Sequence, residues 1–202
     1  MVSKWAIFRG VMGKGSPADS SPLRVKVTEG NHGIADRGAS VAYQSSGISL
    51  RLGLTRRQDD GVPGVFDDRR SDHADFRAEL PLGPQDRLEV FAGLSASRVG
   101  TGQYGPDTTD PIRQRRIDLS FGQVRWHHEV APGNHLQLSL LHQEETGEDS
   151  FVLRNPGLLA GLPFAVQVPV SYDNSVIRDE IELQHTLSSG RDLRFNWGLG
   201  YR

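Results

Sequence analysis

Hydrophobic and polar residues alternate along much of this chain with a period of two. The clearest run places aliphatic side chains at Ile48, Leu50, Leu52 and Leu54, with small or polar residues between them. A helix would spread these four side chains around its circumference, whereas a strand puts them all on one face. The pattern therefore predicts a β-strand with one apolar face and one polar face.

The same alternation recurs in successive segments and predicts an all-β chain. The predicted strands cover residues 23–29, 37–44, 48–57, 72–82, 86–97, 115–128, 134–145, 177–187 and 191–201. Phe91 breaks the pattern by falling on a polar position. Between Ile117 and Trp126 the apolar positions change from odd to even. One extra residue near Gly122 and Gln123 would produce this change, so we expect a β-bulge there.

The predicted connections also alternate, between short polar turns such as residues 45–47 and long loops. The long loops cover about residues 58–71, 98–113 and 147–176. Compact soluble domains rarely need several loops of this length at one end, whereas transmembrane β-barrels have short turns on one side and long loops on the other. The pattern therefore favours an antiparallel up-and-down meander of about nine strands that forms part of a transmembrane β-barrel.

Composition narrows the possible partners. The formal net charge is −2, so the chain lacks the excess of Lys and Arg that a nucleic-acid-binding protein needs, and we expect no nucleic-acid partner. No apolar run is long enough to predict a membrane-spanning helix. The absence of cysteine suits an oxidising compartment but is also common in cytosolic proteins.

Four stretches carry a resemblance to a known family: GNHGIADRGASVAYQSSGISLRLGLTRRQDDG, DHADFRAELPLGPQDRLEVFAGLSASRVGTG, IDLSFGQVRWHHEVAPGNHLQLSLLHQEETGEDSF and DEIELQHTLSSGRDLRFNWGLGYR. Over residues 30–202 the chain resembles the early barrel strands of a TonB-dependent outer-membrane receptor. The resemblance implies a barrel of about 22 strands around an N-terminal plug. It also implies a Gram-negative outer membrane and uptake of a scarce ligand, such as a ferric siderophore, haem or cobalamin. Its partners would be outer-membrane lipid, this ligand, and TonB acting only through a plug.

The chain departs from that family near its start. It shows no plug pattern, no segment like a TonB box and no signal peptide. All three lysines and both methionines lie within the first 26 residues. We therefore expect residues 1–22 to be an atypical, disordered leader and residues 23–202 to be a partial barrel domain. Because complete bacterial barrels have an even number of strands, we also expect a fragment that is not competent for transport alone.

No motif predicts catalysis, so we expect neither enzyme activity nor a cofactor. His127 and His128 are adjacent on a predicted strand and would point to opposite faces, which disfavours a shared metal site. The acidic residues between Asp59 and Asp72 lack the spacing of a calcium loop, and no nucleophile motif is present. A soluble all-β binding module or a small porin-like barrel stays open as an alternative function.

If the barrel interpretation holds, the polar strand positions line the lumen. These positions are Ser49, Arg51, Asp75, Arg77, Glu79, Glu89, Asp118, Ser120, Glu180, Glu182, Arg194 and Asn196. The long loops would meet the ligand first, because function gathers on loops held by a rigid scaffold. Their aromatic residues Tyr104, Phe151 and Tyr172 are the expected ligand contacts.

Overall fold

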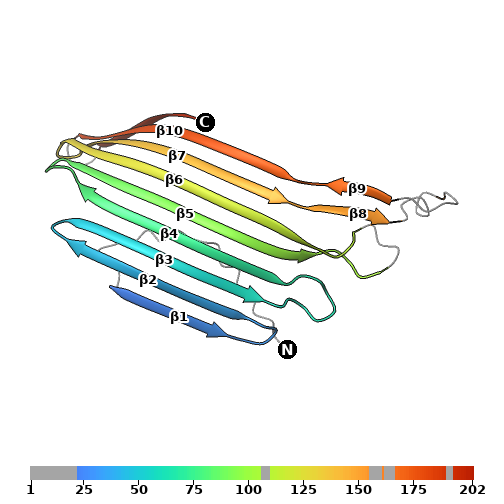
Figure 1. Ribbon diagram of the computed structural model, residues 1–202. Coiled ribbons are helices and arrows are strands. Elements are labelled where there is room, and N and C mark those ends of the chain that lie inside the picture. Colours follow the sequence, from blue (N-terminus) through green and yellow to red (C-terminus); the bar gives the residue numbers. More distant parts are fainter. Residues whose placement is uncertain (1–21, 106–109, 155–160, 162–166, 190–192) are drawn as a thin grey trace.

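The computed structural model describes residues 22–105, 110–154, 161, 167–189 and 193–202, and every regular element in these residues is a strand. Nine of the strands form one antiparallel meander in which chain neighbours pair in order (Figure 1). They are β1 (Leu23–Glu29), β2 (Ala35–Ser45), β3 (Ile48–Asp59), β4 (Arg69–Pro81), β5 (Asp86–Thr101), β6 (Arg113–Ala131), β7 (Asn134–Glu148), β10 (Asn174–Ser189) and β11 (Leu193–Tyr201). The predicted all-β meander is confirmed.

The leader predicted over residues 1–22 lies, apart from Pro22, outside the described residues. The loop predicted over residues 147–176 contains a further hairpin, formed by β8 (Ser150–Arg154) and β9 (Gln167–Ser171). This hairpin continues outward from β7 and β10, beyond the end of the main sheet (Figure 1). In the described residues, no helix is long and apolar enough to cross a membrane.

The turn between β2 and β3 shows how the sequence sets the register. Ser45 pairs with Ile48, so Ser46 and Gly47 form a two-residue turn. Both turn residues have positive φ, 49° and 82°, as a type I′ hairpin requires. This turn fixes which residues of the two strands face each other, and therefore which face each side chain occupies.

The sheet has two chemically different faces. Cross-strand partners share a face, and Leu54, Ala74 and Leu94 are partners on β3, β4 and β5. We call their side the apolar face. The opposite side, which carries the partnered residues Ser49, Glu79 and Glu89, is called the polar face. The alternation that begins at Ile48 therefore continues in register on the neighbouring strands and gives the sheet its two faces.

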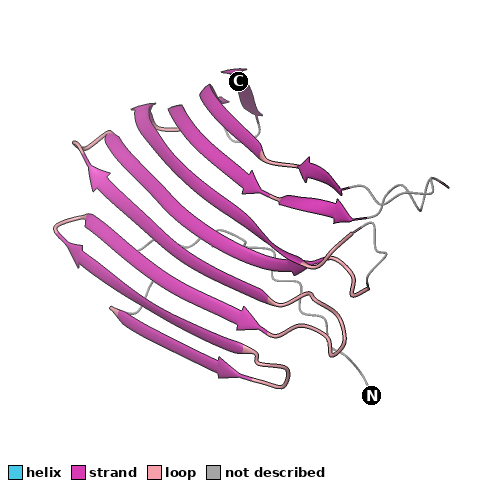
Figure 2. Cartoon of the chain, turned by 45° about the vertical axis from the view of Figure 1, so that its right-hand side comes forward, coloured by secondary structure: helices cyan, strands magenta, loops and turns pink. Residues whose placement is uncertain are grey.

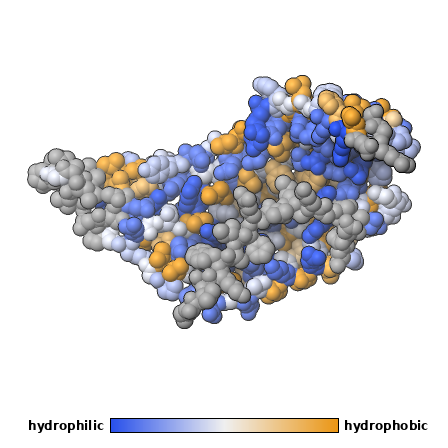
Figure 3. Space-filling view, turned by 180° about the vertical axis from the view of Figure 1, so that it is seen from behind, coloured by the Kyte–Doolittle hydropathy of each residue, from blue (hydrophilic) through white to orange (hydrophobic). Residues whose placement is uncertain are grey.

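The apolar face is the more exposed of the two. Leu94 is 62% exposed, whereas Glu89 on the polar face is only 7% exposed. Other large apolar side chains with substantial exposure on the apolar face are Val25, Val41, Leu52, Leu54, Phe76, Leu140, Ile181 and Leu199. The described strands form a single curved layer, and Ala78 is its one buried apolar residue (Figure 2). From the rear, hydrophobic side chains lie at the surface among polar ones (Figure 3).

The prediction of a β-bulge near Gly122 and Gln123 is wrong. β6 pairs with β5 without interruption from Arg113 to His128, and its only register shift against β7 lies between Glu129 and Ala131. The phase change in the sequence therefore means that the apolar residues of β6 move from one face of the sheet to the other along the strand. In the loop-side half of β6, the residues Ile117, Leu119 and Phe121 occupy the polar face.

Candidate functional site

The centre of the polar face is organised around the carboxylate of Glu89. Arg125 Nη1 lies 3.2 Å from one Glu89 oxygen, and Arg87 Nη2 and His127 Nε2 each lie 3.4 Å from the other. Glu89 is buried, and a buried carboxylate is stable only when nearby charges and hydrogen-bond donors compensate for its lost hydration. The polar face therefore has a built, charge-paired centre that joins β5 to β6.

Phe91, the exception to the sequence pattern, belongs to the same cluster. The guanidinium of Arg77 on β4 lies 4.9 Å from the Phe91 ring centroid, and that of Arg125 on β6 lies 5.5 Å from it. A cation placed over an aromatic ring is attracted by the negative charge of its face. Arg77 also reaches Glu79 at 2.9 Å. Phe91 therefore connects two arginines across three strands.

The polar face also holds buried donors without an acceptor among the described residues. The Nε atoms of Arg51 and Arg125 are two of them. Buried polar groups in proteins are normally paired, with protein or with ordered water. These donors suit a face turned toward a hydrated or polar space.

The structure places the predicted lumen residues on two faces instead of one. Ten of them share the polar face: Ser49, Arg51, Asp75, Arg77, Glu79, Glu89, Glu180, Glu182, Arg194 and Asn196. Asp118 and Ser120 lie on the apolar face, because they pair with Ala96 and Leu94. Their assignment with the other ten is therefore wrong. Sequence reasoning also missed Arg87 and Arg125, which contact Glu89, and it weighed His127 only as a metal ligand.

A second cluster lies at the loop end, where β6 begins and β7 ends. Arg113 is bound to Asp149 by two hydrogen bonds, of which Nη2 to Oδ2 measures 3.2 Å, and also contacts Asp110. The Arg113 and Asp149 side chains are only 13% and 10% exposed. The hydrogen bonds that Arg113 donates to Asp149, and after them the one that it donates to Asp110, raise the pKa of Arg113 despite its burial. The pair is a firm connection at the base of the β8–β9 hairpin.

Asp173 secures the other side of that base. Its carboxylate accepts hydrogen bonds from Ser171 Oγ at 2.7 Å, from Ser150 Oγ at 3.0 Å and from the Asp149 N–H at 2.7 Å. These bonds, the one from Ser171 first, lower the pKa of Asp173. The hairpin is therefore held in place by hydrogen bonds that need an ionised carboxylate.

The structure brings together two of the three predicted ligand-contact residues. The Phe151 and Tyr172 ring centroids are 5.9 Å apart, and the Arg113 guanidinium lies 4.0 Å from the Phe151 ring. Tyr104 lies apart from them and packs edge-on against Phe66, with 6.3 Å between centroids. The loop end therefore presents two aromatic pairs, with Tyr104 and Tyr172 each more than 60% exposed.

The histidines and aspartates that could ligate a metal ion form hydrogen bonds and ion pairs instead. His127 faces Glu89, whereas its neighbour His128 lies on the opposite face, 2.9 Å from Asp86. In the loop after β3, Asp67 accepts the Val62 N–H at 2.8 Å, and Asp68 accepts Gln114 Nε2 at 3.0 Å. In the described part of the chain, no three His, Cys, Asp or Glu side chains are grouped so as to hold a metal ion.

Comparison of the sequence with protein-family models and with curated proteins finds no match. The geometry is consequently the main guide to function. It consists of a single curved sheet with an exposed apolar face, an ion-paired polar face and structured connections at one end.

Proposed function

We propose that residues 23–202 form part of the barrel wall of a TonB-dependent outer-membrane receptor, which takes up a scarce ligand such as a ferric siderophore. The observation that carries this proposal is the exposure of the apolar face opposite a more buried, charge-paired face. In water, each exposed Leu or Ile side chain forgoes up to about 2 kcal/mol of burial. Lipid would supply that burial, and the polar face would line the lumen.

The extent of the apolar face suits a bilayer. On β5 the apolar positions run from Leu88 to Ala96. Eight steps of about 3.3 Å give roughly 26 Å along the strand, or about 20 Å after a tilt of about 40°. The apolar band of outer-membrane barrels is about 25 Å tall. Beyond this run the same face becomes charged, beginning with Arg98.

The open edges of the sheet support a larger barrel. In the described residues, β1 and β11 each pair with one neighbour, and all their residues are exposed. As the first and last of nine antiparallel strands, they run in the same direction. Closing an antiparallel barrel therefore requires an odd number of further strands, and lipid does not tolerate unpaired strand edges. We infer that this sheet works together with additional strands.

Single cysteines can test the membrane placement, since the chain has none of its own. Leu94→Cys and Ser95→Cys are adjacent on β5 but lie on opposite faces. After reconstitution of the full chain into phosphatidylcholine vesicles, a membrane-impermeant maleimide should label Ser95→Cys and spare Leu94→Cys. Leu54→Cys and Thr55→Cys provide a matched second pair on β3.

Two results would count against the proposal. Equal labelling of both faces, or a monodisperse and cooperatively melting monomer without detergent, would instead support a soluble binding module. The receptor role has its own test. A strain lacking the gene should lose uptake of radioactive iron supplied as ferric hydroxamate or ferric catecholate chelates. Unchanged uptake of both would contradict the siderophore role but not the membrane placement.

A further inference from the structure

Three arginines stand in register on neighbouring strands of the apolar face. Arg70 on β4 pairs with Arg98 on β5, and Arg98 pairs with Arg116 on β6. All three are exposed. Since adjacent strands lie about 4.8 Å apart, the three backbone positions fall within about 10 Å. Like charges directly opposite one another destabilise a sheet, so this row requires an explanation.

Carboxylates of the protein compensate for this charge only in part. Arg116 Nε lies 2.8 Å from Asp118, and Arg70 Nε lies 3.8 Å from Asp72, which is already hydrogen-bonded to Arg56. Arg98 forms no ion pair with any described residue. A second opposed pair, Arg37 and Arg56, follows on β2 and β3. These five arginines face Asp72, Asp118 and, beside Arg116, Glu148.

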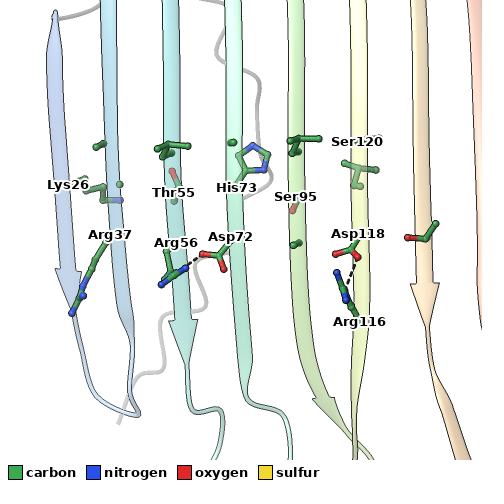
Figure 4. A pocket seen from close by; sticks show the side chains of 18 of the residues that line it. Lys26, Arg37, Thr55, Arg56, Asp72, His73, Ser95, Arg116, Asp118 and Ser120 are labelled. Carbon is green, nitrogen blue, oxygen red and sulfur yellow. Dashed lines mark hydrogen bonds and ion pairs between the residues drawn. The ribbon is translucent and has the colours of Figure 1, made fainter.

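The row borders an amphipathic hollow. A depression of about 1150 Å³ is lined at its charged end by Arg37, Arg56 and Arg116; Arg37 extends toward the loop end of the strands, whereas Arg116 turns toward Asp118 (Figure 4). The remaining lining includes the apolar residues Leu54 and Leu94. Cations and exposed aliphatic side chains therefore share one continuous surface, at the level where the apolar positions of β3, β4 and β5 end.

We propose that the row Arg70–Arg98–Arg116 binds the phosphate monoester headgroup of an anionic membrane lipid whose acyl chains lie on the apolar face. Guanidinium groups bind phosphate through paired hydrogen bonds, and a phosphate among the three would replace their repulsion with a shared attraction. The apolar residues below the row, Leu94 and Leu54, would contact the acyl chains. This inference rests on the proposed membrane placement and adds a preferred lipid class to it.

Lipid retention tests the inference with a matched control. The full chain is folded in maltoside micelles, and native mass spectrometry compares bound dilauroyl phosphatidic acid with bound dilauroyl phosphatidylcholine. The test variant is Arg70→Gln with Arg98→Gln. The control is Arg69→Gln with Arg115→Gln, which removes the same charge from adjacent positions on the other face. We expect the test variant to lose about thirtyfold of the preference for phosphatidic acid, since each arginine contributes a factor of about five.

Each outcome is informative. Retained preference in the test variant, or an equal loss in the control, would overturn the arginine row as the binding site. If inorganic phosphate competes as strongly as phosphatidic acid, the acyl chains do not contribute to binding, and the site binds free phosphate and not a lipid. Equal labelling of Leu94→Cys and Ser95→Cys by the membrane-impermeant maleimide would overturn the membrane placement itself. If the double variant does not fold, Arg98→Gln alone, which breaks no ion pair among described residues, should lose about fivefold.

Discussion

Phe121 on β6 lies directly over Gly93 on β5, and a Cβ added to Gly93 would come within 2.3 Å of the ring atom Cε1. The two residues are cross-strand partners on the polar face. Phe121 therefore lies on the polar face, and its ring fills the space that the missing side chain of Gly93 leaves open. This contact is one reason why the apolar positions of β6 change face without any bulge.

Replacing Gly93 should destabilise the fold. In Gly93→Val the new side chain would collide with a ring that the pairing of β5 with β6 holds in place, and overpacking of this kind costs about 1–3 kcal/mol. Urea unfolding in micelles, followed by tryptophan fluorescence, measures the loss. Gly122→Val is the control, because an added Cβ at Gly122 meets no described atom within 4 Å. Equal destabilisation of both variants would mean that the loss of glycine, and not the Phe121 contact, is responsible.

The Arg113–Asp149 pair should matter more than the ion pairs exposed on the strands. Asp149→Asn would leave the largely buried Arg113 guanidinium without its main counter-charge, at a cost of about 2–3 kcal/mol. Hydrogen exchange should show faster opening of β8 and β9. Asp72→Asn, which breaks the exposed pair with Arg56, should destabilise the fold much less than Asp149→Asn does. Similar exchange rates in the two variants would argue against a special role for the buried pair.

Acid should loosen the same hairpin through Asp173. Its pKa in the folded chain is lower than the ordinary value of 3.8, so ionised Asp173 stabilises the fold above that value. This contribution is lost as the pH falls from about 3.8 through the lower folded pKa. Carboxyl NMR titration should show the depressed pKa, and amide protection of β8 and β9 should fall in the same range. In Asp173→Asn the pH dependence should disappear; if it persists unchanged, another group is responsible.

Local patterns in the sequence were sufficient to predict the strands, but they did not predict which side chains are neighbours across strands. The two-residue alternation placed Ile48 to Leu54 correctly, because strand geometry fixes it within one element. It misplaced Asp118 and Ser120, because the apolar positions of β6 do not keep one phase along its 19 residues. The pairing of Arg98 with Arg116 depends on the register between strands, which no single segment encodes. The β8–β9 hairpin escaped notice because its strands are only five residues long and one contains Pro169.

The Glu89 carboxylate should be the most sensitive charge on the polar face. Glu89→Gln keeps the shape of the side chain but leaves Arg125, only 30% exposed, without its charge partner across the β5–β6 pair. A fully buried pair would cost about 3–5 kcal/mol, and the partial exposure of Arg125 reduces this to about 2 kcal/mol. The control is Glu144→Gln, an exposed carboxylate on the apolar face, which should change stability by less than about 0.5 kcal/mol. Urea unfolding of both variants in micelles makes the comparison, and a neutral Glu89→Gln would mean that water already screens this cluster.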